Sequence, residues 1–194
     1  MSVRSSARAM AAASESTLER FERTIVPLMD SAYTLARHLV RDESDAQDVV
    51  QEAYLRAWRH YAGFRGGDER AWLLTIVRNC CYTWRRSNRS GRDTVEYDDE
   101  EHGDDESGLS TTTDALVLEE ANRAELRLAL DGLPREFREA IVLREIEGLS
   151  YKEIGHIIGA PIGTVMSRLA RARGRLQKAL GVGARLGEGE VRPG

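Results

Sequence analysis

Apolar residues recur along most of the chain at intervals of three and four positions, the spacing typical of one face of an α-helix. Three such stripes lie in the first half, over residues 21–39, 46–58 and 73–84. No segment shows the alternation of apolar and polar residues expected of a strand. The pattern therefore predicts an all-α fold, with one helix over residues 21–39.

The helical pattern is interrupted in ways that predict two domains. Three glycines within residues 63–67 disfavour helix and separate the second stripe from the third. From residue 92 to 113 apolar residues nearly vanish, so this segment cannot bury enough surface to fold alone. The pattern returns at Asp114, Pro134 suits the first turn of a further helix, and Gly148 suits a helix end.

We accordingly predict two small helical domains joined by a flexible acidic linker. The N-terminal domain covers residues 17–91, the linker 92–113 and the C-terminal domain 114–182. A disordered leader over residues 1–16 and a flexible tail over 183–194 flank them, and a transit peptide is a weaker interpretation of the leader.

Charge is distributed unevenly over the 194 residues. The net charge of −4 includes nine acids between Asp93 and Glu106, a stretch without Lys or Arg. Without these nine, 23 acids remain against 28 basic residues, which gives a formal charge of +5. The basic residues cluster on either side of the acidic run, around residues 78–92 and 168–178. Two basic patches flanking one acidic run suggest two contacts with nucleic acid.

Several classes of protein are disfavoured by what the sequence lacks. The longest purely apolar run, Ala71 to Leu74, is far short of the roughly 20 residues of a membrane span, so we expect no membrane insertion. The four histidines have no metal-ligand spacing, and we expect no metal and no cofactor. The two cysteines are adjacent, which fits a reducing cytoplasm better than a disulfide framework.

Cys80 and Cys81 lie within the third helical stripe. Cys81 falls on the apolar face and is expected to be a small core residue. A redox-sensing role for Cys80 requires this thiol to be exposed beside the arginines, which would lower its pKa.

The most specific local motif is a helix-turn-helix in the C-terminal domain. Ser150 and Glu153 form a capping box at the start of a short helix, and residues 159–163 supply a Gly/Pro turn. The second helix, beginning near Pro161 to Thr164, is apolar on one face and rich in arginine on the other. A short helix, a tight turn and an Arg-rich helix suit the DNA major groove. The alternative is a solvated amphipathic helix without a ligand.

A second motif is the acidic helix start over residues 45–58, where Asp45, Asp48 and Glu52 share one face. Taken alone, this pattern is more typical of a solvated surface than of catalysis, because no histidine or nucleophile accompanies the carboxylates. We predict no catalytic residue.

Together these motifs resemble the sigma-70 family of bacterial RNA polymerase sigma factors. Residues 45–58 with Phe64-Arg65-Gly66 are similar to the family's core-binding and promoter-melting module. Residues 148–154 and 161–173 are similar to its promoter-reading helix-turn-helix. The two modules are nearly adjacent, as in the extracytoplasmic-function (ECF) group, and the resemblance covers about residues 21–180.

The resemblance implies three contact surfaces. Core RNA polymerase, through the clamp coiled coil of its largest subunit, would bind Asp45, Asp48, Gln51, Glu52 and Leu55. The −10 promoter element would be melted by Phe64, Arg65, Thr75, Arg78, Asn79, Tyr82 and Arg86. The −35 element would be read by Met166, Ser167, Ala170 and Arg171, with the DNA backbone held by Thr164, Arg168 and Arg173. Simple packing is an equal alternative for Tyr82.

Further partners also follow from the resemblance. An anti-sigma factor is expected to inhibit the chain by masking its polymerase-binding surfaces, and the free chain is expected to be a monomer. The acidic linker either enters the polymerase active centre as a mimic of nucleic acid or is a solvated tether. Two rival functions remain: a self-sufficient helix-turn-helix regulator with an N-terminal sensor domain, and a metal-dependent nuclease using the carboxylates of residues 98–106.

Overall fold

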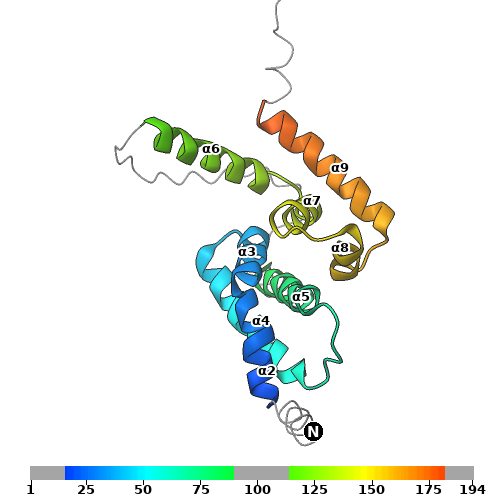
Figure 1. Ribbon diagram of the computed structural model, residues 1–194. Coiled ribbons are helices and arrows are strands. Elements are labelled where there is room, and N and C mark those ends of the chain that lie inside the picture. Colours follow the sequence, from blue (N-terminus) through cyan, green and yellow to red (C-terminus); the bar gives the residue numbers. More distant parts are fainter. Residues whose placement is uncertain (1–15, 90–113, 182–194) are drawn as a thin grey trace, which may run out of the picture. The chain divides into compact units, whose positions relative to one another are not determined.

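The computed structural model describes residues 16–89 and 114–181, with the side chains of 89 and 114–120 left aside (Figure 1). Every regular element in these two ranges is a helix, which confirms the all-α class. The chain divides into two compact units: the first takes in the residues up to Asn88 together with His156–Gly159, and the second takes in Arg89–Gly155 and the residues from Ala160 onward. The predicted leader (apart from Ser16), linker and tail lie outside the described residues.

The N-terminal unit contains α2 (Thr17–Thr24), α3 (Met29–Val40), α4 (Glu43–Tyr61) and α5 (Glu69–Arg89). The prediction of one helix over residues 21–39 is wrong at its centre, where Val26–Leu28 form a 3-10 turn. Pro27 explains the interruption, because proline lacks the backbone N–H that a continuous α-helix requires. The apolar spacing survives the break, so Phe21, Ile25 and Leu35 are still all buried.

Side-chain caps define where these helices begin. Ser16 and Glu19 form a capping box at α2, with bonds of 3.1 Å to the Glu19 amide and 2.8 Å to the Ser16 amide. Asp42 accepts a 2.9 Å bond from the Asp45 amide at the start of α4, and Asp68 does the same for Ala71 at α5. Each cap satisfies a backbone donor that the first helical turn leaves without a partner.

The core of the N-terminal unit is built on close packing of α3 against α4. Ala46, Ala53 and Ala57 of α4 are completely buried, and such small side chains let the helix axes approach closely. Leucines of α3 and the inner face of α5 fill the remaining volume, namely Leu35, Leu39, Leu73, Leu74, Val77 and Cys81.

The C-terminal unit contains α6 (Asp114–Asp131), α7 (Arg135–Ile141), α8 (Tyr151–Ile158) and α9 (Ile162–Ala179). A π-helical turn, Val142–Ile146, continues α7. Pro134 stands one residue before α7 as its N-cap, one position earlier than the first turn for which the sequence suited it. Helix α9 packs against α7 and contacts α6.

A buried arginine joins α6 to α7. Arg138 is only 1% exposed, and its guanidinium donates to the carbonyl oxygens of Leu130 (2.9 Å), Asp131 (3.1 Å) and Leu133 (2.8 Å). These carbonyls belong to the end of α6 and the turn after it, where helical N–H donors run out, although the Leu130 carbonyl also accepts a 3.1 Å bond from the Leu133 amide. Arg138 therefore caps α6 from within α7, and the sequence pattern did not predict this role.

Candidate functional site

The acidic face of α4 carries the five residues predicted to bind core polymerase. Asp48, Gln51 and Leu55 are exposed, whereas Asp45 and Glu52 are half-buried. Partial burial and the nearby charges of Asp42 and Asp48 raise the pKa of Asp45. The fold thus brings all five side chains to one surface of one helix, with Asp48 exposed to solvent.

Glu52 differs from the other carboxylates because it already has a partner. It accepts a 2.6 Å bond from Arg56 Nε one turn later on α4. This pair neutralises part of the acidic face, so the accessible negative charge of the surface is concentrated toward the start of α4.

Beside the acidic face, α3 and α4 enclose an open groove of about 560 Å³. Apolar and aromatic side chains dominate its lining, including Met29, Tyr33, Tyr54, Leu55 and Trp58. Leu55 is 47% exposed, and Met29 and Trp58 are each 43% exposed. The sequence analysis missed the contribution of α3, although Met29 lies off the predicted apolar stripe and was available as a signal.

Tyr54 anchors the floor of this groove. Its hydroxyl donates a 3.0 Å bond to the carbonyl oxygen of Ile25, just after α2. Burial, together with the charge of Asp30, raises the pKa of Tyr54 to about 12, so the ring stays neutral at physiological pH. The groove between α3 and α4 is therefore a mainly apolar surface bordered by carboxylates of Asp30 and of the acidic face of α4.

The loop between α4 and α5 carries Phe64 and Arg65, the pair predicted to receive a −10 base. Phe64 is half-buried, and its ring centroid lies 4.8 Å from that of Trp72 and 6.1 Å from that of Tyr61. Arg65 is exposed. Gly66 and Gly67 follow with φ of 87° and 122°, a backbone region that other residues rarely adopt. The loop thus presents one packed aromatic ring beside one accessible guanidinium.

The other residues predicted to act on the −10 element lie along α5. Asn79 and Arg86 are exposed, while Thr75, Arg78 and Tyr82 are half-buried. The Arg78 guanidinium lies 4.3 Å from the centre of the Tyr82 ring, which holds the two side chains together as a cation–π pair. The Thr75 hydroxyl donates 2.8 Å to the carbonyl of Ala71 within its own helix.

The structure contradicts the exposed thiol that redox sensing by Cys80 would require. Cys80 is 3% exposed and Cys81 is fully buried. Burial raises the pKa of Cys80, and the opposing effect of the Arg56 charge is smaller. The basic residues of this region therefore do not activate the thiol, because Cys80 faces the unit's interior instead of the arginine-lined surface.

The helix-turn-helix forms where the sequence predicted it. The capping box is present, with 2.6 Å from the Ser150 amide to Glu153 Oε2 and 3.3 Å from the Glu153 amide to Ser150 Oγ. The turn is tight because the Ala160 amide donates 2.9 Å to the Gly155 carbonyl. A Cβ at Gly155 would lie 2.8 Å from the Ala160 carbonyl oxygen, so only glycine fits there.

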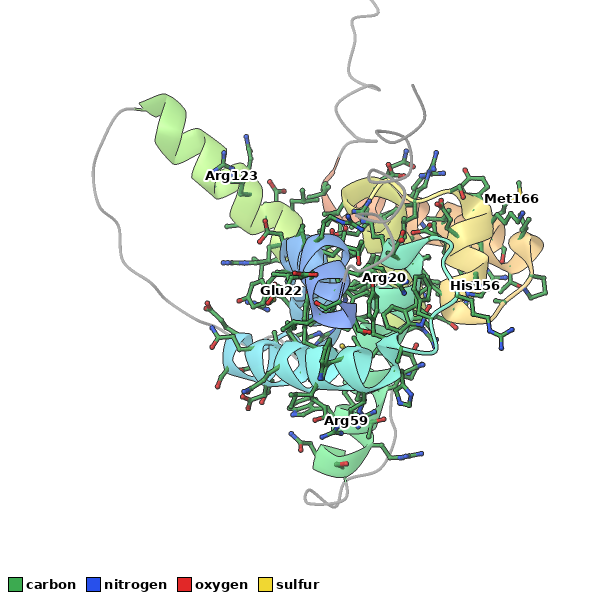
Figure 2. All side chains as sticks on the ribbon, turned by 60° about the horizontal axis from the view of Figure 1, so that its bottom comes forward. Arg20, Glu22, Arg59, Arg123, His156 and Met166 are labelled. Atoms are coloured by element: carbon green, nitrogen blue, oxygen red, sulfur yellow. The ribbon has the colours of Figure 1, made fainter. Side chains whose placement is uncertain are left out.

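Helix α9 is divided into the two faces that the sequence predicted. Val165, Leu169 and Ala172 are buried, while four of the predicted −35 residues are exposed, namely Met166, Ser167, Ala170 and Arg171. Figure 2 shows the Met166 side chain pointing away from α9. The Ser167 hydroxyl donates 2.9 Å to the carbonyl of Thr164, which itself is half-buried.

Two arginines of α9 are already paired with acids of the same unit. Arg173 Nη2 lies 2.7 Å from Glu145 Oε1, and Arg168 Nη2 lies 3.4 Å from Glu136 Oε2. The bond to Glu145 and a weaker one to Tyr151 raise the pKa of Arg173. Sequence analysis missed both acids, because each pair joins residues about 30 positions apart. Within the described residues Arg171 makes no ion pair, so its guanidinium faces solvent.

The described residues were also compared with the requirements of a metal site and of a membrane-spanning helix. Within residues 16–89 and 114–181, no three His, Cys, Asp or Glu side chains gather as metal ligands would. The carboxylates of the nuclease hypothesis, residues 98–106, lie outside these ranges. None of the described helices has the length and apolar composition needed to cross a bilayer.

Comparison with known proteins matches both units to one family. Residues 25–91 match the family described as Sigma-70 region 2, and residues 123–176 match Sigma-70, region 4. The ECF RNA polymerase sigma factor SigE of Mycolicibacterium smegmatis is 37% identical over 151 residues, 78% of this chain and 58% of the relative. The RNA polymerase sigma-H factor of Pseudomonas aeruginosa is 32% identical over 165 residues, 82% of this chain and 86% of the relative.

A solved structure is also similar. The sigma factor RpoE of Bartonella quintana, crystallised in complex with the anti-sigma factor NepR, aligns with a TM-score of 0.67 and 30% identity. The alignment covers 84% of this chain and 98% of that one.

Proposed function

Because the chain belongs to the ECF group of the sigma-70 family, we propose that it binds core RNA polymerase and directs transcription initiation at specific promoters. The observation that carries this proposal is the presence of region 2 and region 4 in one chain, in that order. Each region coincides with a helical unit whose accessible side chains suit its task. The chain spans 58% of the length of the SigE relative. The proposed activity in transcription initiation is therefore argued from the two regions that the chain contains.

The proposed polymerase-binding surface is the acidic face of α4, with Asp45, Asp48, Gln51, Glu52 and Leu55. One exposed and two half-buried carboxylates beside an exposed leucine suit a basic helical partner, here the clamp coiled coil of the largest subunit. The groove α3–α4 continues this surface with further apolar area. Electrostatic attraction would speed encounter, and burial of Leu55 would then stabilise the complex.

Promoter melting is assigned to the α4–α5 loop and to α5. Phe64 would stack on a base flipped out of the −10 element, and Arg65 would hold its phosphate. On α5, Asn79 and Tyr82 would contact the unpaired strand, with Thr75, Arg78 and Arg86 beside them. Melting energy comes from trapping unstacked bases, without nucleotide hydrolysis; the sequence has no GxxxxGK[ST] motif.

Recognition of the −35 element is assigned to α9. Met166, Ser167, Ala170 and Arg171 lie on its exposed face and would contact base edges in the major groove. Thr164, Arg168 and Arg173 would hold the DNA backbone. Arg168 and Arg173 are paired with Glu136 and Glu145, so each arginine must either contact a phosphate alongside its carboxylate or exchange the carboxylate for the phosphate.

The remaining features of the proposal concern regulation and state. An anti-sigma factor would hold the chain inactive by covering the surfaces of α3 and α4, a suggestion supported by the NepR complex of the similar B. quintana protein. The free chain is proposed to be a cytoplasmic monomer that needs no cofactor and has no enzymatic activity of its own.

A pull-down with core RNA polymerase tests the proposal. Wild type should bind, and Asp48→Arg should abolish or strongly weaken binding, because it reverses an exposed charge at the centre of the acidic face. Glu22→Arg is the matched control: it makes the same charge change on the exposed surface of α2 (Figure 2) and should bind normally.

Two results would contradict the proposal. Failure of the purified wild type to bind any core enzyme would leave the self-sufficient DNA-binding regulator as the better explanation, tested by tight duplex binding without polymerase. Equal weakening by Asp48→Arg and Glu22→Arg would show that net charge, and not the acidic face of α4, determines binding.

A further inference from the structure

Helix α2 lies outside every surface assigned above, yet its side chains reach the loop that carries Phe64. Arg20 is exposed on α2 (Figure 2), and its Nη2 atom donates a 3.3 Å bond to the carbonyl oxygen of Phe64, 44 residues later. Its Nε atom donates 3.1 Å to the hydroxyl of Tyr61, the last residue of α4. One guanidinium therefore ties α2 to both the start of the loop and the helix before it.

The contact with Tyr61 is part of a closed set of hydrogen bonds. The Tyr61 hydroxyl lies 2.8 Å from Thr24 Oγ1, and Thr24 in turn donates 2.8 Å to the carbonyl oxygen of Arg20. The Tyr61 hydroxyl accepts from Arg20 Nε and donates to Thr24 Oγ1, and the Thr24 hydroxyl donates to the Arg20 carbonyl. Both hydroxyls therefore have a donor and an acceptor partner. The Arg20 guanidinium also lies 4.9 Å from the centre of the Tyr61 ring.

Tyr61 transmits this restraint to Phe64 through ring packing. Tyr61 is 1% exposed, with Phe21 of α2 packed edge-on at 5.1 Å on one side and Phe64 stacked at 6.1 Å and 22° on another. Phe64 also packs against Trp72 of α5, with 4.8 Å between the ring centroids, and stays half-buried, so part of its ring is accessible. The position of the Phe64 ring thus depends on Trp72 and on Tyr61, and Tyr61 is held in turn by Arg20, Phe21 and Thr24 of α2.

We propose that Arg20 is a positioning residue for promoter melting, which holds the Phe64 ring where a flipped base can stack on it. Pre-ordering the ring removes the conformational entropy that an unrestrained loop would lose on capturing a base. This role rests on the proposed function, in which Phe64 stacks on a base of the −10 element. Arg20 affects promoter opening only through the position of Phe64. Arg20 itself touches no DNA in this scheme.

A double-mutant cycle on full-length protein with core polymerase tests the proposal. Arg20→Ala should lower promoter opening, measured by permanganate reactivity of −10 thymines, at least about tenfold, because two charge-assisted hydrogen bonds that hold the loop are lost. In the Phe64→Ala background the same change should have no further effect. Arg59→Ala, which removes another exposed arginine of the same unit (Figure 2), is the control and should open normally.

Additivity of Arg20→Ala and Phe64→Ala would overturn the proposal, since it would show Arg20 acting independently, for instance on a phosphate. So would normal opening by Arg20→Ala. Core binding is measured for every variant, so failure of the wild type to bind or open would count against the proposed function instead.

A second measurement, on the free protein without polymerase or DNA, tests directly whether Arg20 holds the loop that carries Phe64. Hydrogen exchange of the Gly63 and Phe64 amides, bonded at 3.1 and 3.0 Å to His60 and Tyr61, should accelerate at least about fivefold in Arg20→Ala. Unchanged exchange would show that Arg20 does not hold the loop and would overturn the proposal.

Discussion

Replacing Arg138 by alanine should destabilise the C-terminal unit almost to the point of unfolding. The side chain is 1% exposed and donates to three carbonyl oxygens at 2.8–3.1 Å. A hydrogen bond from a charged group contributes about 1.5–3 kcal/mol, and removing Arg138 takes one donor from each of three carbonyl oxygens, of which Leu130 keeps the Leu133 amide. Water can reach part of the space vacated, so we expect a net loss of about 3 kcal/mol or more. Helical units of this size rarely exceed about 3–5 kcal/mol in total.

The distribution of tryptophan makes this prediction measurable one unit at a time. Trp58, Trp72 and Trp84 are the only tryptophans of the chain, and all belong to the N-terminal unit. In urea titrations of Arg138→Ala, tryptophan fluorescence should keep its wild-type midpoint. Far-UV circular dichroism should lose a helical component at low urea or before urea is added. With a slope of about 1 kcal/mol per molar urea, a loss of 3 kcal/mol shifts that component by about 3 M.

Arg138→Lys separates the charge from the geometry. Lysine keeps a cation near the end of α6 but cannot donate to three carbonyls from a planar fork, so an intermediate loss is expected. Arg171→Ala removes an exposed arginine of the same unit and should leave both transitions unchanged. The reasoning is refuted if Arg138→Ala unfolds like the wild type, or if the fluorescence transition moves with the circular dichroism.

The other predictions concern DNA contacts and the buried thiol. Arg171→Ala should cost about 1–3 kcal/mol of discrimination at one −35 base pair, measured by competition between wild-type and mutated promoter duplexes; uniform weakening on all sequences would instead indicate a phosphate contact. Glu145→Gln should strengthen binding of the −35 duplex about two- to fivefold at low salt, because Arg173 no longer has to exchange a carboxylate for a phosphate. Weaker binding by this variant would mean that Glu145 orients Arg173 for DNA. Burial raises the pKa of Cys80, so its alkylation at pH 8 should be at least about tenfold slower than in urea-unfolded protein; labelling at the unfolded rate would show that the thiol is accessible.

Local patterns in the sequence predicted most of the secondary structure and both family motifs. Helical periodicity and caps depend on residues three or four positions apart, so the capping box at Ser150 and the two faces of α9 could be derived without a structure. The break at Pro27 was also readable, because a proline cannot continue the hydrogen bonding of a helix, but the regular apolar spacing across it concealed the interruption. The candidate DNA- and polymerase-binding residues came from the family resemblance, and their roles remain predictions.

Tertiary structure decided how those side chains are presented, because that depends on residues far apart in the chain. Periodicity cannot show that Cys80 faces inward, that Arg173 pairs with Glu145 across 28 positions, or that Arg20 reaches Phe64 across 44. Each of these contacts arises only when helices pack, since packing determines which polar groups lose water and must find a partner in the protein. The sequence alone determined the all-α class, most of the helices and the family to which the chain belongs. Packing determined which arginines are engaged, which thiol is buried and what holds the loop.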